Sequence, residues 1–253
     1  MKGFDLLAVL THPQFSQMLL SGMKMTLIIA LGSWMLAMSL GFVLLVIRML
    51  PSKAADQMVA AYVSYHRNVP TLVQLMLWYF GIANILPAGL QTWLGDHNGE
   101  AIFAIVGLGL CQAAYFSEDL RSGFRSIPPG QDEAARALGH SYLGAMAYVL
   151  LPQAFRNALP ALVNHTVSLF KNSSLAMAIG VAELTHAVKE VENLSFRVFE
   201  AYLIATVVYL ACSLLLMAVA VNPATLAVVN ANVAPSSTVE IENCMPLADI
   251  DLM

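Results

Sequence analysis

The stretch GQDEAARALG, residues 130–139, is a short polar segment between two strongly apolar parts of the chain. Pro128 and Pro129 just before the stretch, together with Gly130 at its start, end any preceding helix. Asp132 and Glu133 then fall in a first helical turn, where carboxylates complement the helix dipole. Alanines propagate a helix, and Gly139 suits a left-handed C-terminal cap. The segment predicts a helix over about residues 131–139, whose small side chains allow a partner surface to approach closely. An ordinary amphipathic connector is the alternative.

The composition around this segment is that of a membrane protein. The chain has 253 residues, of which 58% are hydrophobic and 11% charged, and its mean hydropathy is +0.70. A soluble domain carries about 25% charged residues, so the chain has too few charges to cover a surface that faces water. The net charge of −4 argues against a nucleic-acid partner. Scattered cysteines and histidines indicate no metal site and no cofactor held by this chain.

Charge-free windows locate five predicted transmembrane helices in one all-α domain, residues 25–221. The window between Lys24 and Arg48 is long enough, at about 1.5 Å per residue, to cross a hydrocarbon core about 30 Å thick. A segment predicted to be periplasmic, 1–24, precedes the domain, and a tail predicted to be disordered, 222–253, follows it. The predicted spans are residues 25–47, 58–86, 101–119, 148–170 and 199–221.

The positions of lysine and arginine predict how these spans are oriented. Arg48 and Lys53 follow the first predicted span, and three arginines follow the third, whereas residues 87–100 carry neither lysine nor arginine. The loops after the first and third spans are therefore expected in the cytoplasm. The N-terminus then lies outside, the C-terminus lies inside, and the helix at 131–139 faces the cytoplasm.

The sequence EAA at 133–135, followed by Gly139 and by Leu151-Pro152, resembles the EAA loop of ABC importer permeases. Four further segments resemble permeases of the polar amino acid uptake group in the bacterial inner membrane. These are YVSYHRNVPTLVQ (62–74), AAYFSEDLRSG (113–123), LPQAFRNALPALVN (151–164) and LFKNSSL (169–175). The resemblance implies the type I ABC importer core of five helices, with a coupling helix that sits in a cleft of the ATP-binding subunit. The residues implied for ATPase coupling are Asp132, Glu133, Ala134, Ala135, Leu138 and Gly139.

The chain has no G-x-x-x-x-G-K-[ST] motif, so a non-catalytic subunit is predicted. The expected partners are a cytoplasmic ABC ATPase dimer that binds ATP and Mg²⁺, a second and homologous permease chain, and a periplasmic amino-acid-binding protein. A stand-alone secondary transporter or channel is the alternative, but it predicts an inverted repeat or paired broken helices, and the sequence shows neither. An intramembrane enzyme is poorly supported, because Ser168 and His165 have no orienting acid or G-x-S-x-G context.

Polar residues inside the spans predict the substrate path. A charge at the bilayer centre costs about 2.5–3.5 kcal/mol and normally faces protein or a water-filled path. Arg67, Thr71 and Gln74 share one helical face and are predicted to line the permease interface. Snorkelling of Arg67 to the headgroups is the alternative. Glu118, also a candidate for the path, lies three residues before Arg121, and a structural ion pair is expected there.

Lys171 ends a charge-free stretch, residues 157–170, and should need a partner or an anionic ligand. The resembled family has Lys-Asp-Thr-Ser at this place, whereas this chain has Lys171-Asn172-Ser173-Ser174. Loss of the acid leaves Lys171 freer to attract an anion, which favours glutamate or aspartate as the substrate. Lys171, Asn172 and Ser173 complete the predicted substrate path.

Overall fold

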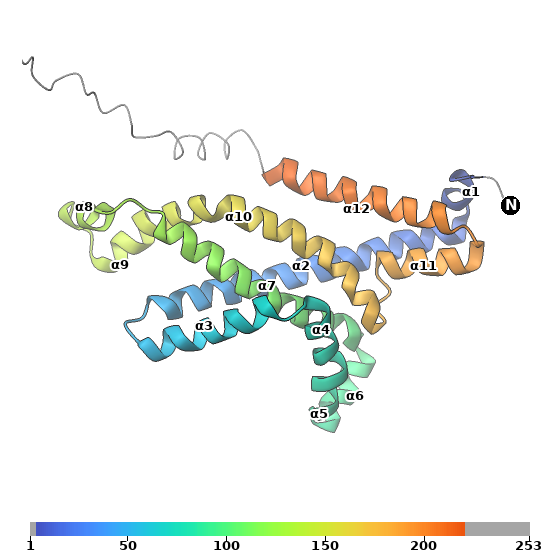
Figure 1. Ribbon diagram of the computed structural model, residues 1–253, viewed down its shortest axis with the longest axis horizontal. Helices are drawn as coiled ribbons and strands as arrows, with labels where there is room; N and C mark the ends of the chain where they lie inside the picture. Colours follow the sequence, from blue (N-terminus) through green and yellow to red (C-terminus); the bar gives the residue numbers. More distant parts are fainter. Residues whose placement is uncertain (1–3, 221–253) are drawn as a thin grey trace, which may run out of the picture.

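The computed structural model describes residues 4–220, which are helical with no strand among them (Figure 1). The predicted tail, 222–253, lies outside the described residues. Two of the segments, η1 and η2, are π-helical, and η3 is a 3-10 helix. The segments in chain order are α1 (Leu7–Leu10), α2 (Pro13–Met49), α3 (Lys53–Asn68), α4 (Thr71–Met76), η1 (Leu77–Ile82), α5 (Ala83–Ile85), α6 (Ala88–Asp96), α7 (Gly99–Arg125), α8 (Gln131–Ala137), α9 (Tyr142–Ala145), η2 (Met146–Leu150), α10 (Leu151–Asn172), η3 (Ser173–Ile179), α11 (Leu184–Ser195) and α12 (Val198–Ala220).

Helix α7 is the centre of the fold, and α2 and α10 pack along it. Small residues on α7 let the neighbouring backbones approach closely, as is common between membrane helices. At Gly123, for example, an added Cβ atom would lie only 2.3 Å from the carbonyl oxygen of Ala154 in α10. The close contact of α7 with α10 therefore depends on a residue without a side chain.

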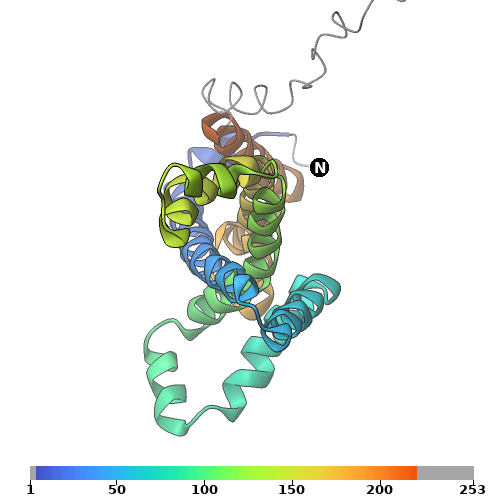
Figure 2. The ribbon, with the colours of Figure 1, turned by 90° about the vertical axis from the view of Figure 1, so that its left-hand side faces the viewer.

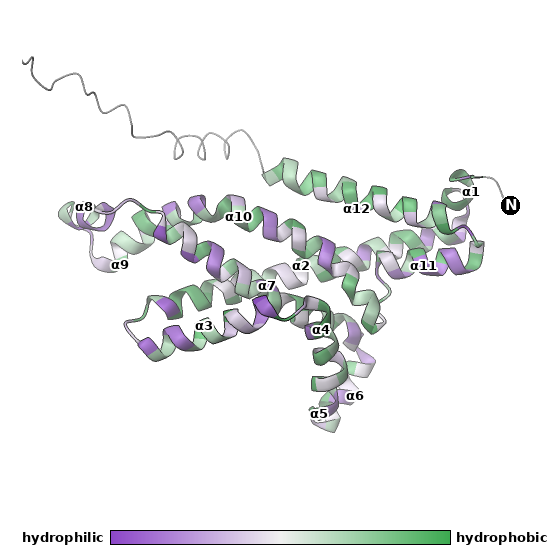
Figure 3. Cartoon of the chain, in the orientation of Figure 1, coloured by the Kyte–Doolittle hydropathy of each residue, from purple (hydrophilic) through white to green (hydrophobic). Residues whose placement is uncertain are grey.

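The two ends of the molecule carry different elements (Figure 1). The short helices α8 and α9 lie at one end, together with the turn between α2 and α3, and α1 and α11 lie at the other. Three of the described helices, α2, α7 and α12, are long and apolar enough to cross a membrane. Helix α12 is apolar nearly all round, whereas α11 and α8 carry many hydrophilic residues (Figure 3).

The first long helix begins at Pro13, well before the predicted start at residue 25. Proline suits the first turn of a helix, and nothing between it and Lys24 interrupts the helix. Residues 13–24 therefore belong to α2 rather than to a separate N-terminal segment. Lys24 begins the charge-free window, but the helix itself starts eleven residues earlier, at Pro13.

The second predicted span, 58–86, is wrong as a single helix. Val69 and Pro70 have extended backbone, with ψ angles of 131° and 135°, and separate α3 from α4. Proline disfavours a helical conformation in the residue before it and cannot donate the helical hydrogen bond. After this break, α4 to α6 project away from the rest of the bundle (Figure 2).

Helix α11 occupies part of the connection that the predicted spans leave between residues 170 and 199. The Glu183 carboxylate accepts hydrogen bonds from the backbone N–H groups of Thr185 and His186, at 2.9 Å each, and so caps the helix. The apolar side chains at 184, 187, 188 and 191 share one face and are buried. This amphipathic pattern was present in the sequence.

The other predicted spans agree more closely with helices. Helix α7 contains residues 101–119 and continues to Arg125. The turn η2 and α10 together cover residues 148–170. Helix α12 begins one residue before the predicted start at 199 and continues to Ala220, the last described residue.

Candidate functional site

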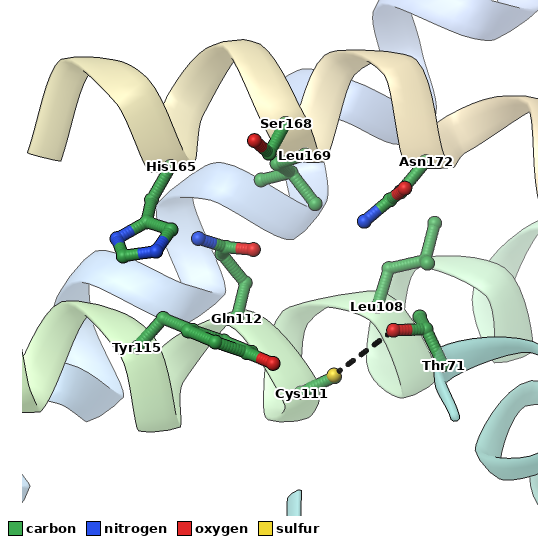
Figure 4. Close-up of a pocket in the computed structure, with 9 residues that line it drawn as sticks. All are labelled: Thr71, Leu108, Cys111, Gln112, Tyr115, His165, Ser168, Leu169 and Asn172. Carbon is green, nitrogen blue, oxygen red and sulfur yellow. Dashed lines mark hydrogen bonds between the residues drawn. The ribbon is translucent and has the colours of Figure 1, made fainter. Parts of the chain in front are cut away.

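A hollow of about 250 Å³ lies between α4, α7 and α10 (Figure 4). It is smaller than the roughly 300–1,000 Å³ of pockets for drug-sized ligands, so its size suits a small solute. We call it the central cavity. Its lining residues are Thr71, Leu108, Cys111, Gln112, Tyr115, His165, Ser168, Leu169 and Asn172.

The lining has the same spacing on both long walls. On α7 the residues are at positions 108, 111, 112 and 115, and on α10 at 165, 168, 169 and 172. Steps of three and four residues keep side chains on one face of a helix, so each wall is a stripe of mixed polar and apolar character. The sequence analysis missed Cys111, Gln112 and Tyr115, although this spacing was visible in the sequence.

Gln112 stands out among the polar groups of the central cavity. Its side chain rises from α7 toward α10, between His165 and Asn172 (Figure 4). The residue is only 5% exposed, and its amide nitrogen has no hydrogen-bond partner. Buried polar groups are normally hydrogen-bonded. The amide nitrogen of Gln112 therefore has a hydrogen-bonding capacity that no described residue fills.

The charged and titratable side chains near the central cavity include His165, Asp119 and Arg67. His165 Nδ1 lies 2.6 Å from the buried Asp119 carboxylate, which ties α10 to α7. The exposed Arg67 guanidinium lies over the ring of Tyr115, 5.5 Å from its centroid. Asp119 and Arg67 themselves are outside the lining. The walls of the cavity are thus mainly uncharged hydrogen-bonding groups.

Two of the predicted substrate-path residues, Thr71 and Asn172, line the central cavity. Thr71 Oγ1 is 3.5 Å from Cys111 Sγ on the facing helix. Lys171, next to Asn172, is exposed, and no described residue forms an ion pair with it. The α10 helix turns the Lys171 side chain away from the hollow, because neighbours in a helix point in different directions.

Gln74 and Ser173 are buried in the protein instead of lining this hollow. The Gln74 amide donates to the carbonyl oxygens of His66, at 3.0 Å, and Val69, at 2.7 Å. It thereby satisfies carbonyl groups at the break after α3. The Ser173 hydroxyl donates to the Phe170 carbonyl oxygen at 2.6 Å. Both side chains satisfy the backbone of their own region.

Glu118 lies in a separate cluster of charges, outside the central cavity. It pairs closely with Arg48 at the end of α2 and lies 3.8 Å from Arg121. Asp56 in α3 completes the cluster, 3.3 Å from Arg48 and 3.8 Å from Arg121. The expected pair of Glu118 with Arg121 is present, but the nearest partner of Glu118 comes from another helix. The cluster joins α2, α3 and α7.

The polar segment at 130–139 forms helix α8, which begins at Gln131 and ends at Ala137. Gly130 and Gly139 flank it with φ angles of 92° and 90°, a left-handed conformation that glycine adopts without strain. The predicted cap at Gly139 is confirmed.

The faces of α8 differ. Ala135 is buried at 4% exposure, whereas Glu133, Ala134 and Gly139 are exposed and Leu138 is 84% exposed. Asp132 is half-buried and pairs with Arg136 at 2.6 Å. The helix therefore rests on the protein through Ala135 and in part through the half-buried Gln131 and Asp132, and it presents its other residues outward. Within residues 4–220, no cluster of three or more histidine, cysteine or acidic side chains suits a metal ion.

Comparison with known proteins decides the family. The model of the family described as "Binding-protein-dependent transport system inner membrane component" matches residues 35–222. The chain belongs to this family. The resemblance inferred from the EAA segment is thereby confirmed.

Relatives of this permease are found among amino-acid transporters. A probable amino-acid ABC transporter permease protein, PatM of Vibrio harveyi, is 36% identical over 71% of this chain and 78% of its own. The glutamate/aspartate import permease protein GltJ of Escherichia coli K12 is 30% identical, over 79% of this chain and 82% of its own. The arginine transport system permease protein ArtQ of Bacillus subtilis is 34% identical, over 81% and 90%.

A solved structure extends the agreement to the fold. A crystal structure of an amino acid ABC transporter with histidines superposes with a TM-score of 0.73 at 29% identity. The match covers 87% of this chain and 97% of that chain. This permease therefore has the ABC importer permease fold and is a non-catalytic inner membrane subunit of an amino-acid ABC importer.

Proposed function

We propose that this permease forms half of a translocation path that carries a polar amino acid inward, driven by a separate ATPase. In this proposal the chain crosses the membrane five times, with its N-terminus outside and its C-terminus in the cytoplasm. The central cavity is the place where the amino acid rests during passage. The distribution of lysine and arginine and the opposite positions of α8 and α11 in Figure 1 support this orientation.

The central cavity is the observation that carries the proposal. It is a polar hollow inside a strongly apolar chain, between helices of the central bundle. Polar groups inside a membrane bundle normally mark substrate or ion pathways, because burying them is otherwise unfavourable. Its volume of about 250 Å³ suits a solute of amino-acid size. Thr71 and Asn172 contribute to it as sequence analysis expected.

Helix α8 is the proposed site of ATPase docking. Its outward face combines the acidic side chains of Asp132 and Glu133 with small alanines and the exposed Leu138. An apolar side chain 84% exposed at the tip of a loop is suited to burial against a partner. ATP and Mg²⁺ would bind to that partner, a dimer of ABC ATPases, and a periplasmic binding protein would deliver the amino acid.

A second, different permease chain is the proposed partner within the membrane. Two glutamate/aspartate import permease proteins of Escherichia coli, GltJ and GltK, match this chain at 30% and 33% identity. Two distinct permeases named for the same substrates are consistent with pairs of unlike subunits. Helices α4 to α6 project from the bundle in Figure 2. Their exposed apolar side chains offer a surface for such a partner.

The relatives differ in the amino acid that their names give: glutamate or aspartate, arginine, and nopaline. Glutamate or aspartate thus stays a prediction for this chain, based on Lys171. An exposed Lys171 would act on an acidic substrate only at the interface with a second permease. Unchanged competition by glutamate in a Lys171→Ala transporter would exclude this role.

Reconstitution tests the proposed function. The permease is co-expressed with the ATPase, the second permease chain and the binding protein, and the complex is placed in liposomes. We expect uptake of a labelled polar amino acid that requires ATP and all four components. Uptake that continues without the ATPase would support a stand-alone secondary transporter or channel instead.

A further inference from the structure

The amide of Gln112 has a hydrogen-bonding capacity that the described residues do not fill. Its nitrogen is buried without a partner, on a residue that is 95% buried and directed into the central cavity. A buried amide left unpaired is costly. A solute that accepts a hydrogen bond from this nitrogen would remove that cost.

The other polar groups of the central cavity include acceptors as well as donors. The Ser168 hydroxyl already donates to the Asn164 carbonyl oxygen at 3.0 Å, so its oxygen is left as an acceptor toward the cavity. Asn172 and Gln112 each present an amide oxygen and an amide nitrogen. A bound solute therefore meets groups that need a donor next to groups that need an acceptor.

This lining discriminates between an amide and a carboxylate on the substrate side chain. A side-chain amide both donates and accepts, whereas an ionised carboxylate only accepts. A carboxylate would place its charge beside acceptor oxygens, in a lining without a lysine or an arginine. Burying a charge that is not paired is strongly unfavourable. The Asp119–His165 pair does not supply a free positive charge, because its two partners already face each other at 2.6 Å.

We infer that the central cavity selects amino acids with an uncharged side chain that can both donate and accept hydrogen bonds, with Gln112 as the specificity-determining residue. This inference rests on the proposed function, and it names an uncharged polar amino acid in place of the acidic substrate predicted from Lys171. Glutamine and glutamate are the matched probes, because they differ only in the amide or carboxylate of the side chain. Their shared α-amino and α-carboxylate groups cancel in the comparison.

Arg67 is the residue that most favours the competing acidic substrate. Its guanidinium is exposed and lies over Tyr115, whose ring forms part of the wall. If the cavity took glutamate, this cation would offer a counter-charge. A test must therefore compare the Gln112 and Arg67 variants directly.

The experiment measures binding of labelled glutamine and glutamate to the purified complex of both permease chains with the ATPase. The binding protein is left out so that its own selectivity does not contribute. We expect glutamine to bind at least about tenfold more tightly than glutamate. Gln112→Leu should weaken glutamine binding by about tenfold, the value of one net hydrogen bond. Arg67→Ala should leave glutamine the preferred ligand.

Gln57→Leu is the matched control, because Gln57 is an exposed amide on α3, away from the cavity. It should change neither affinity. Should Gln112→Leu fail to assemble with the ATPase, Asn172→Leu at a half-buried position of the facing wall tests the same selectivity. It should also weaken glutamine binding more than glutamate binding.

Tighter binding of glutamate than glutamine, or unchanged glutamine binding in both cavity variants, overturns the inference. Glutamate binding that is lost in Arg67→Ala would assign the cavity to acidic amino acids. The proposed function itself fails differently. It is excluded if the complete transporter with its binding protein takes up no amino acid in the presence of ATP.

Discussion

Helix α8 is built from residues close together in the sequence, whereas the central cavity joins Thr71 in α4 to Asn172 at the end of α10. The boundaries of α8 come from local features: two glycines with positive φ angles and an alanine-rich turn between them. The cavity exists only because α7 and α10 pack together with Thr71 beside them. Local rules therefore predict α8 well, and they predict only the separate stripes of the cavity wall.

Helix α8 and the central cavity are also expected to serve different steps of transport, ATPase docking and substrate binding. The outward residues of α8 lie on a surface and depend little on the packing of the core. The residues of the central cavity depend on how closely the helices approach. Changes in α8 should thus affect the use of ATP, and changes at the helix contacts should affect stability and the cavity together.

The largest expected effect is that of Glu133→Lys on transport. Glu133 is exposed on α8, and reversing its charge should weaken docking of the ATPase. We expect ATP-driven uptake to fall by about tenfold to a hundredfold, with unchanged substrate binding and thermal stability. Uptake in liposomes and co-purification of the ATPase measure this. Glu190→Lys on α11 is the control, and equal loss in both variants would contradict a specific role for α8.

Gly123→Ala should disturb the contact of α7 with α10 and therefore the central cavity. The new Cβ atom would lie 2.3 Å from the Ala154 carbonyl oxygen, so the helices must separate. Overpacking of this kind costs about 1–3 kcal/mol. We expect a lower melting temperature in detergent and weaker amino-acid binding. Gly89→Ala on α6 is the matched control, since nothing lies within 4 Å of its added Cβ. Equal melting temperatures would show that the helices adapt at no cost.

Glu183 forms another contact between residues that are distant in the sequence. It is fully buried, and its carboxylate accepts from Tyr209 Oη at 2.9 Å and lies 3.4 Å from Thr26 Oγ1. Burial raises the pKa of this carboxyl group, and hydrogen bonds from Thr185, His186 and Tyr209 offset part of the rise. The folded state thus keeps the proton to higher pH than the unfolded state does. The protonated group contributes most to stability below the ordinary pKa of about 4.3, and this contribution is lost as the pH rises through the raised value.

Replacing Glu183 by Gln should remove this pH dependence, because an amide does not titrate. We expect the melting temperature of the wild-type permease to fall as the pH rises above the ordinary glutamate pKa of about 4.3, and that of Glu183→Gln to fall less. Melting curves in detergent across this range measure it. Glu190→Gln on the same helix should behave like the wild type. Parallel curves for wild type and Glu183→Gln would contradict a raised pKa.

The smallest effect is expected for the ion pair within α8. Asp132 and Arg136 lie 2.6 Å apart at spacing i, i+4, and the arginine side chain is 53% exposed. Such pairs contribute about 0.3–0.5 kcal/mol. Arg136→Gln should therefore leave the melting temperature within about one degree of the wild type. A loss as large as that of Gly123→Ala would mean that α8 also stabilises the core.

Much of the fold followed from local patterns. The apolar segments predicted α7 and α12, and the EAA segment with its glycines predicted α8. The helix boundaries that differ from the prediction are set by single residues. Pro70 breaks the second predicted span, Pro13 begins the first helix, and Glu183 caps a helix between two predicted spans. In each case a single side chain outweighed the composition of the surrounding window.

The candidate site was predicted less completely than the fold. Thr71 was identified from its spacing to Arg67 and Asn172 from its place next to Lys171, whereas Gln112 was overlooked although it is a polar residue within a predicted span. Its importance comes from the empty space beside it and from the unpartnered nitrogen. Gln74 shows the reverse, since the same residue type is satisfied there by backbone carbonyl groups.

The sequence by itself determined the membrane class, the family and the position of α8, because these depend on composition and on residues close together in the chain. The tertiary structure decided which polar side chains face the same space. That choice depends on the approach of α7 to α10, which Gly123 permits, and on the break at Pro70 that brings Thr71 to the cavity. The sequence shows that Gln112 can form hydrogen bonds. Only the packing of helices that are distant in the sequence shows that its amide nitrogen has no partner.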